Sequence, residues 1–178
     1  MLRQLAIKRI ALIDDLTLDF TDGLGVLTGE TGAGKSILLD SLGLVLGSRA
    51  DPGLVQAGAE RASVSAVFDA GALDLARSVL AEAAIDLEPD DDRLILRRVL
   101  SAEGRSRAFV NDQPVSVGLL RLVGARLVEV QGQFDAGGLT DPAGHRDLLD
   151  AFAGLTAQRA TVTAAWRDWQ GRAKALAD

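Results

Sequence analysis

The chain contains no cysteine and a single histidine, His145. Disulfide frameworks and thiolate metal sites are therefore excluded, and so is a histidine-rich metal site. No stretch approaches the roughly 18 apolar residues of a membrane span. The first residues also lack the apolar run of a secretory signal peptide. A soluble intracellular protein is the default expectation.

Basic residues are outnumbered, with 19 Lys and Arg against 25 Asp and Glu, which gives a formal net charge of −6. This balance argues against a globally basic nucleic-acid binder, although it leaves room for a local basic patch. The hydrophobic content of 48% is enough for a packed core. The length of 178 residues corresponds to one domain, or one domain with an appendage.

Residues 29–36 form a complete phosphate-binding loop of the type G-x-x-x-x-G-K-S. Its glycines let successive N–H groups point at a phosphate. Lys35 is placed to reach the β- and γ-phosphates, and Ser36 to offer its hydroxyl to Mg²⁺. Because the chain has only three lysines, a chance match to a glycine-rich turn is the weaker alternative. The motif predicts a nucleotide site with Mg²⁺, and the expected contacts are Gly29, Glu30, Thr31, Gly32, Ala33, Gly34, Lys35, Ser36 and Ile37.

The segments that flank this loop fit the motif. Residues 26–28 have the pattern of a buried strand, and residues 37–45 have apolar positions at helical spacing. Gly47 is placed to end that helix. A phosphate would therefore lie at a helix N-terminus, where the dipole and the free N–H groups favour anions.

The rest of the chain predicts an α/β fold with a mixed sheet and an antiparallel subsheet, because strands dominate early and helices late. Further strands are expected at 5–7, 10–20, 62–69, 93–100, 106–111 and 126–130. Further helices are expected at 73–85 and 117–123 and from Asp141-Pro142 onward.

The last stretch has the spacing of a coiled-coil seam, in steps of four and three residues. The seam positions are Leu155, Arg159, Val162, Trp166, Trp169, Ala173 and Leu176. An ordinary helix that packs its stripe on the domain explains the spacing equally well. Since the helical pattern still runs at Asp178, we expect the natural protein to continue beyond this residue.

At the phosphate loop and its flanks the sequence resembles the SMC-like ATPases, and among them the bacterial RecN-type DNA repair family. The matching stretches are 5–7 with 11–13, 27–40, 47–50, 96–98, 104–111 and 132–133. The resemblance implies the N-terminal lobe (1–154) of an ABC-type ATPase head, followed by the start of a coiled-coil arm (155–178). Arg9-Ile10 stands where the family usually has Asn-Phe, which puts a base or ribose contact there in doubt.

The same resemblance implies further parts of the ATPase that lie outside residues 1–178. A C-terminal lobe of the same protein would carry the signature motif, the Walker B aspartate and the catalytic glutamate. Two heads would form a homodimer around two ATP molecules and act on DNA, as ends or single strands, in the bacterial cytoplasm and nucleoid. Gln133 or Gln131 would be the loop glutamine that touches Mg²⁺ or water, with Gln133 favoured. Arg49 would point at phosphate, although a surface role explains it equally well.

Two other candidate sites have plainer alternatives. Asp69 ends an apolar strand like a Walker B aspartate, but no acid follows it, so capping of the next helix is the preferred interpretation. Arg97, Arg98, Arg105 and Arg107 cluster on the expected hairpin. They would contact DNA phosphates or, as the favoured alternative, form salt bridges with the acidic turn at 90–92.

His145 is expected on a helix surface, and Trp166 and Trp169 are expected to serve in packing.

A GTP switch is disfavoured because no Asn-Lys-x-Asp motif is present. A small nucleotide kinase is disfavoured because two strands precede the loop, and a transporter subunit because of the hairpin and the arm. A dimerisation module without catalysis of its own remains the serious alternative. The chain alone is expected to bind ATP without significant turnover.

Overall fold

The computed structural model describes residues 1–29, 34–85, 87, 91–130, 145–146, 149–150 and 152–177. The chain divides into two compact units, Met1–Val128 and Glu129–Asp178. The middle of the phosphate loop (30–33), both candidate loop glutamines and the helix start expected at Asp141-Pro142 lie outside the described residues.

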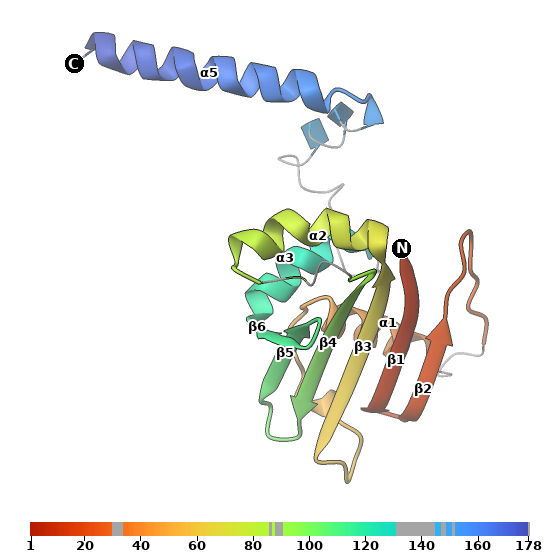
Figure 1. Cartoon of the computed structure of the whole chain (residues 1–178). Coiled ribbons are helices and arrows are strands. Elements are labelled where there is room, and N and C mark those ends of the chain that lie inside the picture. The colour runs from red at the N-terminus through yellow and green to blue at the C-terminus, as the bar shows by residue number, and fades with distance from the viewer. Residues whose placement is uncertain are drawn as a thin grey trace. The chain divides into compact units, whose positions relative to one another are not determined.

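The first unit is built on one antiparallel sheet with the strand order β2-β1-β3-β4-β5-β6 (Figure 1). Its strands are β1 (Leu2–Ile10), β2 (Ile13–Asp19), β3 (Arg61–Asp69), β4 (Arg93–Ser101), β5 (Ser106–Val110) and β6 (Gln113–Val115). Its helices are α1 (Lys35–Val45), the short η1 (Pro52–Leu54), α2 (Ala70–Glu82) and α3 (Val117–Leu127). The antiparallel subsheet expected from the sequence thus accounts for every strand pair in the described part.

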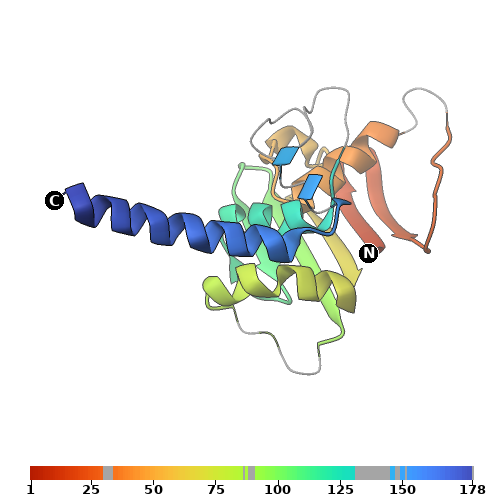
Figure 2. The same cartoon turned by 90° about the horizontal axis from the view of Figure 1, so that it is seen from above.

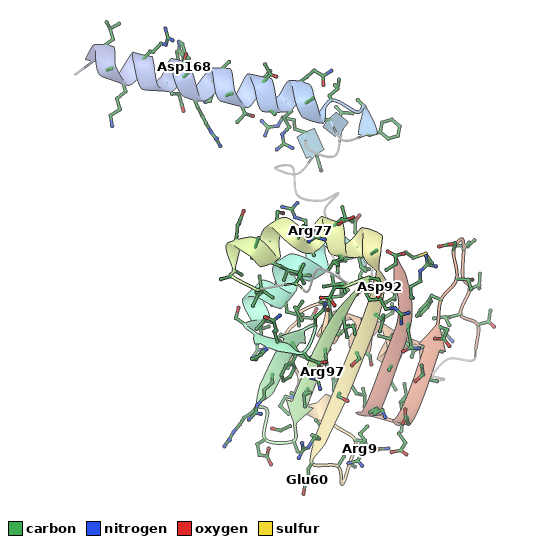
Figure 3. The ribbon with its side chains drawn as sticks, in the orientation of Figure 1. Arg9, Glu60, Arg77, Asp92, Arg97 and Asp168 are labelled. Carbon is green, nitrogen blue, oxygen red and sulfur yellow. The ribbon has the colours of Figure 1, made fainter. Side chains whose placement is uncertain are left out.

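The two faces of the sheet differ because successive side chains of a strand point to opposite sides. All fully buried strand residues share one face, as the cross-strand pairs Ile7 with Val64 and Val64 with Arg98 illustrate. The three helices pack against this face, and α2 and α3 lie side by side (Figures 1 and 2). The open face carries half-buried or exposed side chains, including Arg97 (Figure 3).

Two glycines allow α1 and α3 to meet at backbone contact. A β-carbon on Gly47 would stand 2.6 Å from the backbone nitrogen of Arg121, and one on Gly124 would stand 2.6 Å from the carbonyl oxygen of Leu46. Gly47 also has φ = 98°, so it ends α1 as the sequence predicts. The helix that follows the phosphate loop is therefore held directly against α3.

Two predicted strands are wrong. Residues 24–29 form no regular element, and Val26 and Leu27 are 74% and 57% exposed. Residues 126–130 form no strand either, because α3 continues to Leu127. Neither segment has a strand to pair with in the described part of the chain, so its apolar pattern has no sheet to join.

The second unit contains one long described helix, α5 (Thr156–Ala177), which confirms the helix predicted at the end of the chain. Its described side chains are exposed, apart from the half-buried Arg159. Trp166 and Trp169 lie side by side, with ring centroids 4.7 Å apart. No described helix is both long enough and apolar enough to cross a membrane.

Candidate nucleotide-binding site

The two ends of the phosphate loop lie close together. The Nζ of Lys35, the first residue of α1, donates a hydrogen bond to the carbonyl oxygen of Gly29 at the start of the loop. Lys35 is half-buried and Ser36 is exposed. The described residues of the motif therefore bring its two ends together and place a cation and a hydroxyl at one end of a helix.

The N-terminus of α1 is open to an anion. Gly34 is the N-cap residue, with φ = 86°, and it makes no side-chain cap bond to the first N–H groups of the helix. The first helical bond runs from Leu38 N to Gly34 O at 3.1 Å. The N–H groups of the first turn have no helical acceptor, and they carry the positive end of the helix dipole. Only glycine adopts the left-handed Gly34 conformation at low cost, which explains its place in the motif.

The far end of α1 is anchored in the core. Leu44 and Val45 are buried, and the buried Ser41 hydroxyl donates to Ile37 O at 2.7 Å within the helix. The Arg121 Nε donates to Gly47 O at 3.2 Å across the contact with α3. A fixed C-terminal end leaves the N-terminal end of α1 in a defined position, as an anion site requires.

Two further residues that the sequence analysis names lie away from the start of α1 along the chain. Arg49 is exposed and follows the C-terminal end of α1, whereas Lys35 begins the helix. His145 is exposed in the second unit, within a short helical stretch. The described residues contain no cluster of three acidic or histidine side chains that would hold a metal ion.

Asp69 caps a helix, as the sequence favours. Its carboxylate accepts from the Ala72 N–H at 3.3 Å at the start of α2. The amino group of Met1 lies 2.6 Å from Oδ1, and Arg3 Nη2 lies 3.0 Å from Oδ2. The hydrogen bond from the Met1 amino group is the main cause that lowers the pKa of Asp69 below its ordinary value of 3.8. With these partners Asp69 has a structural role in α2 and the N-terminus.

The four hairpin arginines do not form one patch. Arg97 pairs with Asp112 at 2.7 Å and stacks over the Phe109 ring at 4.4 Å on the open face. Arg98, its neighbour in the sequence, is only 2% exposed. Arg105 and Arg107 alone remain exposed for an outside partner. Strand alternation predicts this split, since adjacent residues of β4 must point to opposite faces.

Comparison with known proteins identifies the family of this chain and its relatives. The family described as an AAA domain matches residues 4–108. A DNA repair protein RecN of Xylella fastidiosa is 41% identical over 170 residues, which cover 96% of this chain and 30% of the relative. A DNA repair protein RecN of Bacillus subtilis is 39% identical and covers 92% of this chain and 28% of the relative.

Among solved structures, the Smc head domain with a coiled coil and joint from Pyrococcus yayanosii has a TM-score of 0.68 at 20% identity. The match covers 99% of this chain and 36% of that one, and it shows a shared fold. The chain spans about 30% of the length of the relative from Xylella fastidiosa. The chain belongs to the AAA-domain family, and it matches the N-terminal ATPase lobe of the RecN-type DNA repair proteins.

Proposed function

We propose that this chain binds ATP with Mg²⁺ at the N-terminus of α1, as the N-terminal lobe of an SMC-like DNA repair ATPase. The observation that carries the proposal is the bond from Lys35 back to Gly29, which joins the two ends of the motif at a helix start that has no side-chain cap. First-turn N–H groups and an adjacent ammonium group suit the β- and γ-phosphates.

Each part of the motif has a separate role. Residues 29–34 wrap the phosphates with backbone N–H groups, and Lys35 supplies positive charge to them. Ser36 offers an exposed hydroxyl that suits Mg²⁺, with Gln133 or Gln131 as a second ligand. Bound Mg²⁺ would neutralise phosphate charge during phosphoryl transfer. Ile37 is expected to contact the nucleotide from the first turn, and Arg49 to act on phosphate once the head is complete.

The C-terminal lobe of the same protein is the first expected partner. Residues 26–28 and 126–130 have the apolar pattern of strands, yet the described structure forms no strand at either. Both segments adjoin a loop of the proposed site, since one precedes the phosphate loop and the other precedes the candidate glutamines. A second sheet completed by the C-terminal lobe would bury them and bring the acidic residues that turnover needs. Two such heads would then pair as a homodimer around ATP.

We place the lobe at 1–154 and the start of a coiled-coil arm at 155–178. The exposed α5 supports an arm, because Val162, Trp166 and Trp169 are 68%, 54% and 57% exposed and lie at the seam spacing. A second helix packed along this seam would remove these side chains from water.

DNA, as ends or single strands, is the expected substrate of the complete protein, which we place in the bacterial cytoplasm at the nucleoid. The DNA repair relatives support this step. Within this chain Arg105 and Arg107 are the hairpin side chains free to meet phosphates.

Calorimetric titration of the chain with ATP tests the proposal. Lys35→Ala should abolish binding, and Ser36→Ala should weaken only the Mg²⁺-dependent part of the affinity. Lys8→Ala is the matched control, because Lys8 pairs with Asp15 at 3.2 Å on the open face. Unchanged ATP affinity of Lys35→Ala would contradict the site, and equal losses with and without Mg²⁺ would contradict the role of Ser36.

A dimerisation module that uses ATP only as a bridge is the second candidate. The engagement of Asp69 with Met1 and Arg3 supports binding without turnover in this chain. ATP-dependent pairing without hydrolysis by the completed head would identify this alternative.

A further inference from the structure

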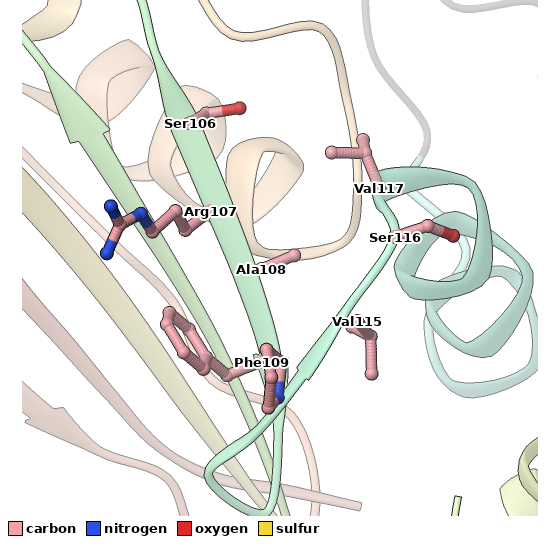
Figure 4. A pocket seen from close by; sticks show the side chains of 8 residues that line it. Ser106, Arg107, Ala108, Phe109, Val115, Ser116 and Val117 are labelled. Carbon is pink, nitrogen blue, oxygen red and sulfur yellow. The ribbon is translucent and has the colours of Figure 1, made fainter. Parts of the chain in front are cut away.

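A notch opens at the edge of the sheet where β6 leaves β5 and the chain turns into α3. Its volume is about 590 Å³. Figure 4 shows the side chains of Ser106 and Ala108 on the side of the strand that faces Val117, whereas Arg107 and Phe109 point to the opposite side. None of the eight lining residues is acidic, in a chain with 25 acidic residues.

The edge of β5 is unpaired in this notch. Odd-numbered residues of the hairpin bond to β4, as Asn111 N does to Ile95 O at 2.9 Å. Alternate residues of an antiparallel strand bond to opposite neighbours, so the even-numbered residues of β5 face β6. β6 pairs with Ala108 and Val110 but does not reach Ser106. The backbone N–H and C=O of Ser106 therefore face the notch.

The opposite wall is the N-terminus of α3. The Ser116 hydroxyl accepts from Leu119 N at 3.1 Å and satisfies one first-turn donor. The N–H groups of Val117 and Gly118 have no acceptor within the helix. They carry the positive end of the dipole of an 11-residue helix, so this wall attracts negative charge.

A buried cation, to which the described residues supply no counter-ion, lies behind the notch. The Arg98 Nη2 donates to Ser106 Oγ at 3.0 Å, while its Nε and Nη1 have no partner in the described part of the chain. Burial lowers the pKa of Arg98, and the charge of Arg121 lowers it further. Since the Ser106 oxygen accepts from Arg98, its own hydroxyl hydrogen is free to be donated into the notch. An isolated buried guanidinium is costly, and a negative group at Ser106 would offset that cost.

We propose that the notch binds an extended acidic peptide segment, which pairs with the edge of β5 at Ser106 and places a carboxylate at the first turn of α3. The free strand edge selects an extended backbone. Ala108, Val115 and Val117 select an apolar side chain beside the carboxylate. Among the described residues, Arg98 is the cation on the side of β5 that faces Val117, since Arg107 points to the opposite side (Figure 4). One cation screened by a hydroxyl suits one carboxylate charge better than a phosphate dianion.

The test uses an acetylated Val-Thr-Val-Thr-Asp amide and its Asn counterpart, titrated into the chain with backbone amide shifts followed by NMR. The Asp peptide should saturate, with the largest shifts at Ser106 and Gly118. The Asn peptide should bind about tenfold more weakly, because it lacks the charge.

Two variants remove one donor each. Ser106→Ala deletes the hydroxyl. Val117→Pro deletes one N–H at the first helical position, where proline is tolerated and where Ser116, at ψ = 152°, already has the conformation that precedes proline. Each should weaken the Asp peptide about tenfold, whereas Ser63→Ala, a matched change on the open face of β3, should not.

Equal affinity for the two peptides, or unchanged affinity in both variants, would overturn the proposal. Inorganic phosphate is titrated in parallel. If phosphate saturates the same amides and displaces the Asp peptide at lower concentration, the notch is a phosphate site and the peptide assignment is wrong.

Discussion

The backbone of Arg121 touches Gly47 so closely that a β-carbon on Gly47 would stand 2.6 Å from the Arg121 nitrogen. This contact joins the C-terminal end of α1 to α3, and the Arg121 Nε bond to Gly47 O reinforces it. The helix that presents Lys35 is thus held by backbone contact, with no side chain between the two segments.

Gly47→Ala should therefore destabilise the chain by about 2 kcal/mol or more, since it combines left-handed strain with a backbone clash. Chemical denaturation measures the loss. Gly58→Ala is the matched control for strain alone, because Gly58 has φ = 83° and open space around its β-carbon position. Its cost should be about 1 kcal/mol. Equal costs at the two positions would show that the α1–α3 contact is looser than described.

Asp69→Asn should lower the free energy of unfolding near neutral pH, because it removes the ionic partner of Met1 and Arg3. The folded-state pKa of Asp69 lies below the ordinary value of 3.8. A lowered carboxyl pKa stabilises the fold above the unfolded-state value, and this stabilisation is lost as the pH falls through the folded-state value.

Thermal unfolding across a pH series measures this effect as the gap in melting temperature between Asp69→Asn and the unsubstituted chain. The gap should be widest at neutral pH and should close below pH 3.8. Asp74→Asn is the control within α2, as its pair with Arg77 is exposed and spans 3.4 Å. A gap that stays constant into acid would show that the loss comes from the cap geometry and not from the charge.

Reversal of Arg105 and Arg107 to Glu in the full-length protein should weaken binding of a single-stranded oligonucleotide and flatten its salt dependence. Each lost phosphate contact should reduce the slope of log affinity against log salt by about 0.7. The double change Arg77→Glu and Arg93→Glu alters the net charge equally at positions away from the hairpin tip. If both double variants lose affinity alike, net charge explains the effect and the hairpin makes no specific contact.

The sequence predicts those helices and strands whose packing partners lie within this chain. The β4–β5 hairpin and the helix that follows the phosphate loop have local signals, and their strands and core positions lie within this chain. The sequence also predicts Asp69 as a cap, because the residue pair that follows it offers no second acid. The helix pattern at 117–123 is confirmed and extends to Leu127.

Three features of the structure escape the sequence analysis, each for its own physical reason. Residues 26–28 and 126–130 are apolar enough for strands, but a strand needs a neighbour, and none of the described segments supplies one. Arg97 and Arg98 are neighbours in the sequence, which suggests one cluster of arginines. They face opposite sides of β4, because adjacent residues of a strand alternate between its two faces. The notch beside Ser106 depends on where β6 ends, which no local pattern specifies.

The last prediction concerns turnover by the chain alone. Lys35 and Ser36 suit ATP and Mg²⁺, but Asp69, the strand-end aspartate that resembles a Walker B residue, is bound to Met1 and Arg3. Without general-base help the rate of hydrolysis falls by about 10²–10⁴-fold, and the loss of a partner's charge stabilisation lowers it further. Residues 1–178 should therefore bind ATP and hydrolyse it negligibly.

A phosphate-release assay checks this prediction, with Lys35→Ala as the background control. Addition of the C-terminal lobe in trans should restore hydrolysis, and the rate should rise faster than linearly with protein concentration because two heads must pair. Hydrolysis by the chain alone that is linear in concentration and absent in Lys35→Ala would overturn the two-lobe architecture. It would mean that a carboxylate within these 178 residues completes the site.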